Sequence, residues 1–136
     1  MADYTKPLPR GDGDNGAFYA FCQRQELRFQ RCTSCHTWRH MPRESCPACG
    51  SFDWHWERSS GKGQVYSWTI IHRALHPGFA ADLPYAAVVI ELVEGVRMVS
   101  HVQGIAPEDL RPGLAVEVFF EAVTPEITLP KFRPIP

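Results

Sequence analysis

The chain has 136 residues, of which 44% are hydrophobic and 21% are charged, and its formal net charge is −1. This length fits one main domain, and the apolar content excludes a chain that is disordered throughout. The small net charge gives no support to a protein whose main task is to bind phosphate backbones, because such proteins usually carry a basic excess.

The N-terminal residues 1–15 are expected to be flexible and contain neither an apolar run nor the cleavage pattern of a signal peptide. The longest apolar run, YAAVVI at 85–90, is far shorter than the roughly 20 residues that a membrane helix needs. These observations predict a cytoplasmic protein without a membrane anchor. Thiols stay reduced in that compartment, so closely spaced cysteines indicate metal or redox chemistry rather than disulfides.

A short helix is expected first, beginning at Asp14 or Asn15 and ending near Arg24. Helical periodicity places on one face Phe18, Phe21, Cys22 and Gln25. Cys22 is interpreted as a small buried hydrophobic residue because its neighbours are aromatic. The alternating residues around 27–29 then predict a strand that leads into the cysteine-rich segment.

Four cysteines follow in the spacing C-x2-C-x10-C-x2-C, namely Cys32, Cys35, Cys46 and Cys49. Two residues between thiolates let one tight turn present both sulfurs to one ion, and two such turns complete a tetrahedral site. The pattern predicts zinc, with iron in a rubredoxin-like site as the alternative. A redox role is disfavoured because thioredoxin-type pairs occur singly. His36 and His40 are expected at the surface rather than as ligands.

Beyond the junction SSGKG at 59–63, the chain changes to strand-forming sequence. The expected strands are 64–73, 84–95, 96–104, 114–123 and a short fifth one at 126–132. Five short strands with one helical turn before the fourth fit a small Greek-key barrel of the oligonucleotide/oligosaccharide-binding (OB) type. A β-sandwich is less suitable, because it needs about seven strands.

The predicted organisation is mainly β, with the helix and ribbon at 16–58, the barrel at 59–124 and a C-terminal strand or arm at 125–136. Pro130 and Pro134 exclude a central strand in the last segment, because proline cannot donate to a ladder. The arm either covers the open edge of its own barrel or lies across a partner, with Phe132 and Ile135 as anchors.

Several motifs occur in a fixed order: FYAF, LRFQRC, CTSC…CPACG, GKGQVYSWTI, PYAAVVIELVEG, PEDLRPG and LPKFRPI. This order resembles the bacterial and archaeal family known as domain of unknown function 35, whose members join a rubredoxin-like zinc ribbon to an OB-fold. The similarity covers about residues 16–133. The four cysteines match the zinc positions of that family.

The resemblance implies a non-catalytic accessory subunit that binds a thiolase-like partner and helps to accommodate an acyl-CoA thioester. Such a chain is not catalytic alone but is a required subunit of an acyl-CoA lyase (retro-aldolase) or acyltransferase complex, for example in steroid side-chain metabolism. A hetero-oligomer is therefore expected. The residues themselves show no nucleophile elbow, phosphate-binding glycine loop or zinc-protease helix.

Two surfaces are candidates for ligand or partner binding. The first is the loop between the first two barrel strands, with His72, Arg73, His76, Phe79 and Tyr85. These residues mix titratable groups with apolar ones, and the open alternative is that they are ordinary loop residues covering the end of the barrel.

The second surface is basic. Five arginines within residues 24–44 outnumber two glutamates there, and these arginines are Arg24, Arg28, Arg31, Arg39 and Arg43. Guanidinium groups bind phosphate in a bidentate manner, so the patch suits the phosphates of a CoA nucleotide or of RNA. It is equally compatible with a solvated surface. Trp38, Trp54 and Trp56 lie nearby, which makes a binder of single-stranded nucleic acid the alternative function.

Overall fold

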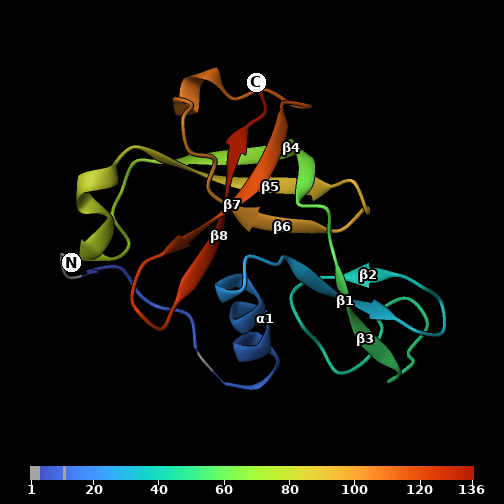
Figure 1. Cartoon of the computed structure of the whole chain (residues 1–136). Coiled ribbons are helices and arrows are strands. Elements are labelled where there is room, and N and C mark those ends of the chain that lie inside the picture. The colour runs from blue at the N-terminus through green and yellow to red at the C-terminus, as the bar shows by residue number, and fades with distance from the viewer. Residues whose placement is uncertain (1–3, 11) are drawn as a thin grey trace.

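The structure is a computed structural model that describes residues 4–10 and 12–136. A helix and a three-stranded sheet lie below a five-stranded sheet in the view of Figure 1. The helix is α1 (Gly13–Gln23), and the small sheet has the order β2 (Trp38–Arg39), β1 (Arg28–Cys32), β3 (Trp54–Arg58). The larger sheet has the order β6 (Arg97–Ser100), β5 (Tyr85–Leu92), β4 (Lys62–Ile71), β7 (Ala115–Ala122), β8 (Thr128–Pro134). Two short 3-10 helices, η1 (Pro77–Asp82) and η2 (Pro107–Asp109), connect its strands.

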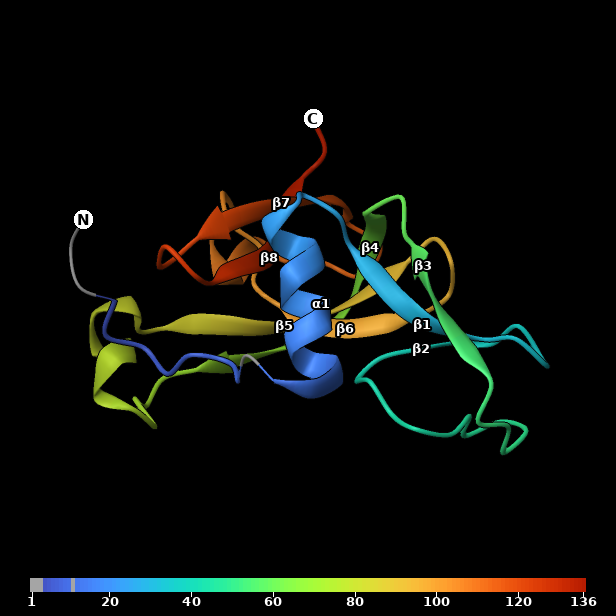
Figure 2. The same cartoon turned by 60° about the horizontal axis from the view of Figure 1, so that its bottom comes forward.

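This architecture confirms the predicted class: mainly β, with one N-terminal helix, a ribbon and an OB-type barrel. The helix begins after the extended residue Asp12, and it buries Phe18 and Cys22. Figure 2 shows it crossing in front of the barrel strands, where it contacts β7 and β8. Residues of the helix and β1 belong to the same hydrophobic cluster as the barrel interior, so the two halves share one core.

The larger sheet is antiparallel and strongly curled, because β4 pairs with β5 along its length and with β7 only through Lys62–Gln64. Gly63 makes this crossing possible, since a Cβ atom there would lie 2.4 Å from the Glu91 carbonyl oxygen. A parallel bridge between Val102 and Phe132 brings the far edges of the sheet together. The curl encloses a core that includes Val65, Val88, Ile90, Val116 and Phe132.

The C-terminal segment completes the barrel. Strand β8 pairs with β7 along its whole length, and the side chain of Phe132 is fully buried. Phe132 is therefore a core residue and not a partner anchor, and the arm covers the edge of its own barrel, the other alternative, whereas Ile135 remains 38% exposed. Prolines are tolerated in β8 because it lies at the edge of the hydrogen-bonded sheet.

No helix in the described part of the chain is long and apolar enough to cross a membrane.

Candidate metal centre and ligand surfaces

The two Cys-x-x-Cys pairs form two turns of the same design. In each turn the N–H four residues after the first cysteine donates to the carbonyl of that cysteine: His36 to Cys32 at 3.0 Å, and Gly50 to Cys46 at 2.8 Å. Both donor residues have positive φ, 65° for His36 and 78° for Gly50, which closes the turn. The Cys35 N–H lies 3.4 Å from the Cys32 sulfur and so favours its thiolate form.

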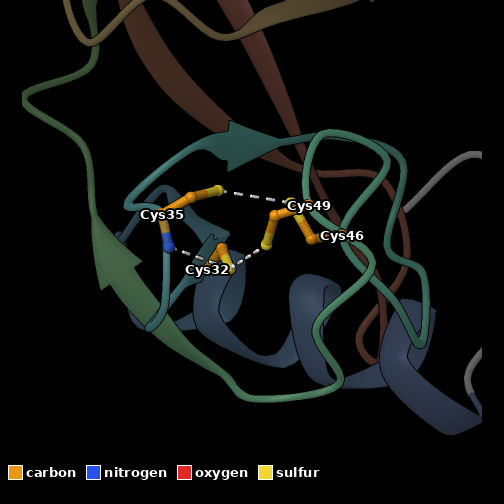
Figure 3. Close-up of side chains that lie close together, drawn as sticks. All are labelled: Cys32, Cys35, Cys46 and Cys49. Carbon is orange, nitrogen blue, oxygen red and sulfur yellow. Dashed lines mark hydrogen bonds between the residues drawn. The ribbon is translucent and has the colours of Figure 1, made fainter.

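The two turns face each other and bring four sulfurs together (Figure 3). Sγ of Cys32 lies 3.6 Å from that of Cys49, Sγ of Cys35 lies 3.5 Å from that of Cys46, and all four atoms lie within 4.8 Å of one another. Four sulfurs bound tetrahedrally to zinc at about 2.3 Å would be roughly 3.8 Å apart. The sulfurs are free thiols, and they lie close enough together to bind one metal ion.

Electrostatics within the cluster also indicate a cation. The side chain and backbone of Thr37 lower the pKa of Cys35 to about 6. The backbone N–H of Ser51 favours the thiolate of Cys49, but hydrogen bonds with neighbouring thiols outweigh it and raise the pKa of Cys49 to about 12. Four adjacent thiolates repel one another, so full ionisation of the cluster requires a bound cation.

The two histidines of the ribbon lie outside the sulfur cluster. His36 is exposed, as expected. His40 is not a ligand either, but it is half-buried rather than fully at the surface, because its ring packs against Phe18 and Phe29, with ring centroids 4.9 Å and 5.3 Å away. Burial lowers the pKa of His40 to about 4, so it is neutral at physiological pH.

The loop between β4 and β5 is organised around stacked aromatic rings. Phe79 and Tyr85 stack with centroids 5.3 Å apart, and Nδ1 of His76 accepts a hydrogen bond from the Gly78 N–H at 3.0 Å. His72 and Arg73, the other two candidates in this loop, are exposed. The structure therefore brings together Phe79 and Tyr85, and it gives His76 a local role as the cap of η1.

The N-terminal segment lies against this loop, which the sequence did not indicate. The ammonium group of Lys6 is 2.6 Å from the Asp82 carboxylate and 5.6 Å from the centroid of the Phe79 ring. Gly78 permits the contact, since a Cβ atom there would be 2.4 Å from the Thr5 carbonyl oxygen. Of the segment expected to be flexible, residues 1–3 and 11 lie outside the described residues.

The basic patch does not form one continuous surface. Arg24 and Arg28 both pair with Glu26, and Arg31 pairs with Glu57 at 2.6 Å. Because these three guanidinium groups already have carboxylate partners, the patch as a whole is poorly suited to phosphate backbones.

The tryptophans do not form a free stacking platform either. The guanidinium of Arg31 lies 5.1 Å from the Trp38 ring centroid, and Trp54 packs edge-on against Trp56. Base stacking needs accessible ring faces, so these contacts disfavour the nucleic-acid alternative.

An apolar surface on the outer face of the barrel was missed by the sequence analysis. It crosses three neighbouring strands, with Tyr66 47% exposed on β4, Val89 on β5 and Val99 67% exposed on β6. Val89 lies directly between Ser67 and Val99 in the sheet register. The unbroken apolar run at 85–90 could have indicated this surface. A strand with one face in solvent normally alternates apolar and polar residues, and this strand does not.

Together, the ribbon with a closed four-cysteine site and the attached OB-type barrel define a zinc-ribbon/OB-fold protein. A family model described as "ChsH2, rubredoxin-like zinc ribbon domain" matches residues 20–55, and one described as "ChsH2, C-terminal OB-fold domain" matches residues 56–121. A "DUF35 domain-containing scaffold protein" of Methanothermobacter thermautotrophicus is 30% identical over 105 residues, which cover 76% of this chain and 78% of the relative. The chain belongs to the DUF35 family.

Two further relatives are more similar in sequence. A "Probable enoyl-CoA hydratase alpha subunit" of Thermomonospora curvata is 41% identical over 129 residues, covering 95% of this chain but only 40% of that protein. The chain thus spans less than half of that relative. A solved structure described as "Ltp2-ChsH2(DUF35) aldolase" contains a chain that is 40% identical, with a TM-score of 0.79 and coverage of 95% of this chain and 98% of that chain.

Proposed function

We propose that this chain is a non-catalytic accessory subunit that binds a thiolase-like partner and helps to accommodate an acyl-CoA thioester. The supporting observation is the 40% identity to a chain of the Ltp2-ChsH2(DUF35) aldolase over 98% of that chain. The name of the Thermomonospora curvata relative, an enoyl-CoA hydratase subunit, also supports a role in acyl-CoA metabolism. The reaction that suits this proposal best is the retro-aldol cleavage of an acyl-CoA, with acyl transfer or thiolysis by the partner as the other options.

The one cysteine outside the metal site is not a candidate nucleophile. Cys22 is fully buried, and burial raises its pKa to about 12. A thiol that is neutral and inaccessible cannot serve as a nucleophile. The four-cysteine site is closed, so its ion, which we propose to be zinc, has no open position for a substrate. Its role is to hold the ribbon in shape.

The outer face of the barrel is the surface that we assign to the partner. Val89 and Val99 pair directly across β5 and β6, and Val99 is 67% exposed. Tyr66 lies at the bulge of β4, where the guanidinium of Arg97 lies 3.7 Å from its ring centroid. Exposed apolar patches of this kind mark protein interaction sites, because their burial removes apolar surface from water. A cytoplasmic hetero-oligomer is the resulting assembly.

The loop with His72, Arg73, His76, Phe79 and Tyr85 is proposed to border the acyl-CoA channel or the partner interface. The neighbouring Leu75 is 83% exposed, which gives the loop an apolar tip beside its titratable groups. His76→Ala and Phe79→Ala are expected to lower partner affinity or the turnover of the complex. If both variants support turnover and partner affinity at the wild-type level, this role for the loop is excluded.

The decisive experiment is capture of the tagged chain from its native lysate, with mass spectrometric identification of the proteins that accompany it. Recovery of a thiolase-fold protein in near-equal amount supports the proposal, and retro-aldol activity of the purified pair on acyl-CoA substrates then tests the reaction. Recovery of the chain alone, or with nucleic acid, argues against it. A capture with Val99→Glu serves as the matched control for specific association.

A further inference from the structure

A cavity of about 470 Å³ lies where the ribbon meets the barrel. The ribbon contributes Trp38, Arg39, His40 and Arg43, and the turn between β5 and β6 contributes Gly95–Arg97. Figures 1 and 2 both show this turn beside the end of β2. The cavity is wide enough for a small molecule and is largely open to solvent.

Arg39 is a buried cation without a counterion among the described residues. Its side chain is only 5% exposed, its Nε donates to Oε1 of Gln30 at 2.7 Å, and its Nη2 donates to the Arg43 carbonyl at 2.9 Å. Both acceptors are neutral, and Nη1 has no hydrogen-bond partner in the described chain. A buried charge without a partner of opposite sign is costly, so an anion next to Arg39 would stabilise this arrangement.

Two further arginines make the cavity electropositive. Arg43 is exposed and forms no ion pair with any residue that the structure describes. Arg97 reaches the same cavity from the barrel and is paired with Glu91 at 3.0 Å. Three arginines from two parts of the fold thus line the cavity, and among the described residues only Arg97 has a carboxylate partner. The guanidinium of Arg97 also lies 3.7 Å from the centroid of the Tyr66 ring.

We propose that this cavity binds the phosphate groups of a nucleotide and that it holds the adenosine 3′,5′-bisphosphate end of coenzyme A. Guanidinium groups bind phosphate oxygens in a bidentate manner, so the arginines of the cavity suit the phosphate groups of this ligand. The cavity is larger than a single phosphate group, so it can also hold the nucleoside. The inference rests on the proposed function, because it specifies which part of the acyl-CoA this chain contacts.

The test is isothermal titration calorimetry of the full, zinc-loaded chain at low salt with adenosine 3′,5′-bisphosphate as the probe. Zinc must be present because its site lies near the cavity: Pro47, which follows the ligand Cys46, lines the cavity. A zinc ion bound by four thiolates has a net charge of −2, and this charge affects the binding of an anion. Arg43→Gln and Arg97→Gln are each expected to weaken binding about tenfold or more. Arg111→Gln, at an exposed arginine outside the cavity, is the matched control and is expected to bind like the wild type.

Three results would overturn the inference: no binding of the bisphosphate, unchanged affinity in both cavity variants, or equal affinity for inorganic phosphate. Tighter binding of a single-stranded oligonucleotide than of the bisphosphate would reassign the cavity to nucleic acid. The proposed function is tested separately. Capture of a thiolase-fold partner by a chain that does not bind the bisphosphate removes only this inference. Cavity binding without any such partner removes the proposed function instead.

Discussion

Sγ of Cys35 lies 3.5 Å from Sγ of Cys46, although the two residues belong to different turns. This distance sets the first prediction. Cys35→Ser removes one of four ligands, so the purified variant is expected to lose most of its metal and the native fold of the ribbon. Elemental analysis should find one zinc per wild-type chain.

The matched control for this prediction is Cys22→Ala. Cys22 is equally free of disulfides but lies in the core, away from the sulfur cluster. This variant is expected to keep one zinc per chain and to lose only about 1 kcal/mol of unfolding free energy for the deleted sulfur. Full metal content in Cys35→Ser would contradict a four-sulfur site.

The second prediction concerns pH. His40 has a pKa of about 4 in the folded chain, against 6.5 as its ordinary value, because its ring is buried. Its contribution to stability is therefore complete above pH 6.5 and is lost as the pH falls toward 4. Between pH 6.5 and roughly pH 5 the free energy of unfolding should fall by up to about 2 kcal/mol from this group.

His40→Leu should remove that part of the pH dependence, since leucine does not titrate between Phe18 and Phe29. Urea unfolding of both proteins at several pH values provides the measurement. Protonation of the metal ligands affects both chains alike and cancels in the difference. Parallel pH profiles for the variant and the wild type would show that His40 is not buried as a neutral ring.

A third prediction separates the core from the surface in the C-terminal strand. Phe132 is fully buried, so Phe132→Ala is expected to lower the free energy of unfolding by about 3–5 kcal/mol. Ile135→Ala, three residues later and partly exposed, should lower it by less than about 1 kcal/mol. Thermal melts monitored by circular dichroism give both values. A small loss for Phe132→Ala with impaired partner binding would restore Phe132 as a partner anchor.

The fourth prediction concerns the outer apolar face. Val99→Glu places a charge at a position that is 67% exposed, so it should change stability by no more than about 0.5 kcal/mol. The same charge would be buried without a partner in a complex, and recovery of the thiolase-fold protein in the capture experiment should drop at least about tenfold.

Phe52→Glu is the control for the fourth prediction, because Phe52 is 72% exposed and lies in the ribbon rather than on the outer face. It is expected to leave capture unchanged. Equal capture by Val99→Glu and the wild type would place the partner on another surface.

Sequence alone was sufficient for the features that depend on local spacing. The C-x2-C turns form from residues that are close in the chain, and Gly50 supplies the positive φ that closes the second turn. Strand patterning likewise predicted the five strands of the barrel, because the alternation of apolar residues reports which face of a strand is buried. The order of the motifs also indicated the family, because that order is a property of the linear chain and does not depend on how the chain packs.

Tertiary structure alone decided what each residue of these elements contacts. Phe132 fills the barrel core while Val99 faces outward, although both lie in strands that were expected. Arg39 is buried against Gln30 in β2, a strand that the sequence did not predict. Arg43 and Arg97 share a cavity because the ribbon packs beside the β5–β6 turn. Spacing determines turns through short-range bonding, whereas burial and the pairing of charges depend on which distant segments pack together.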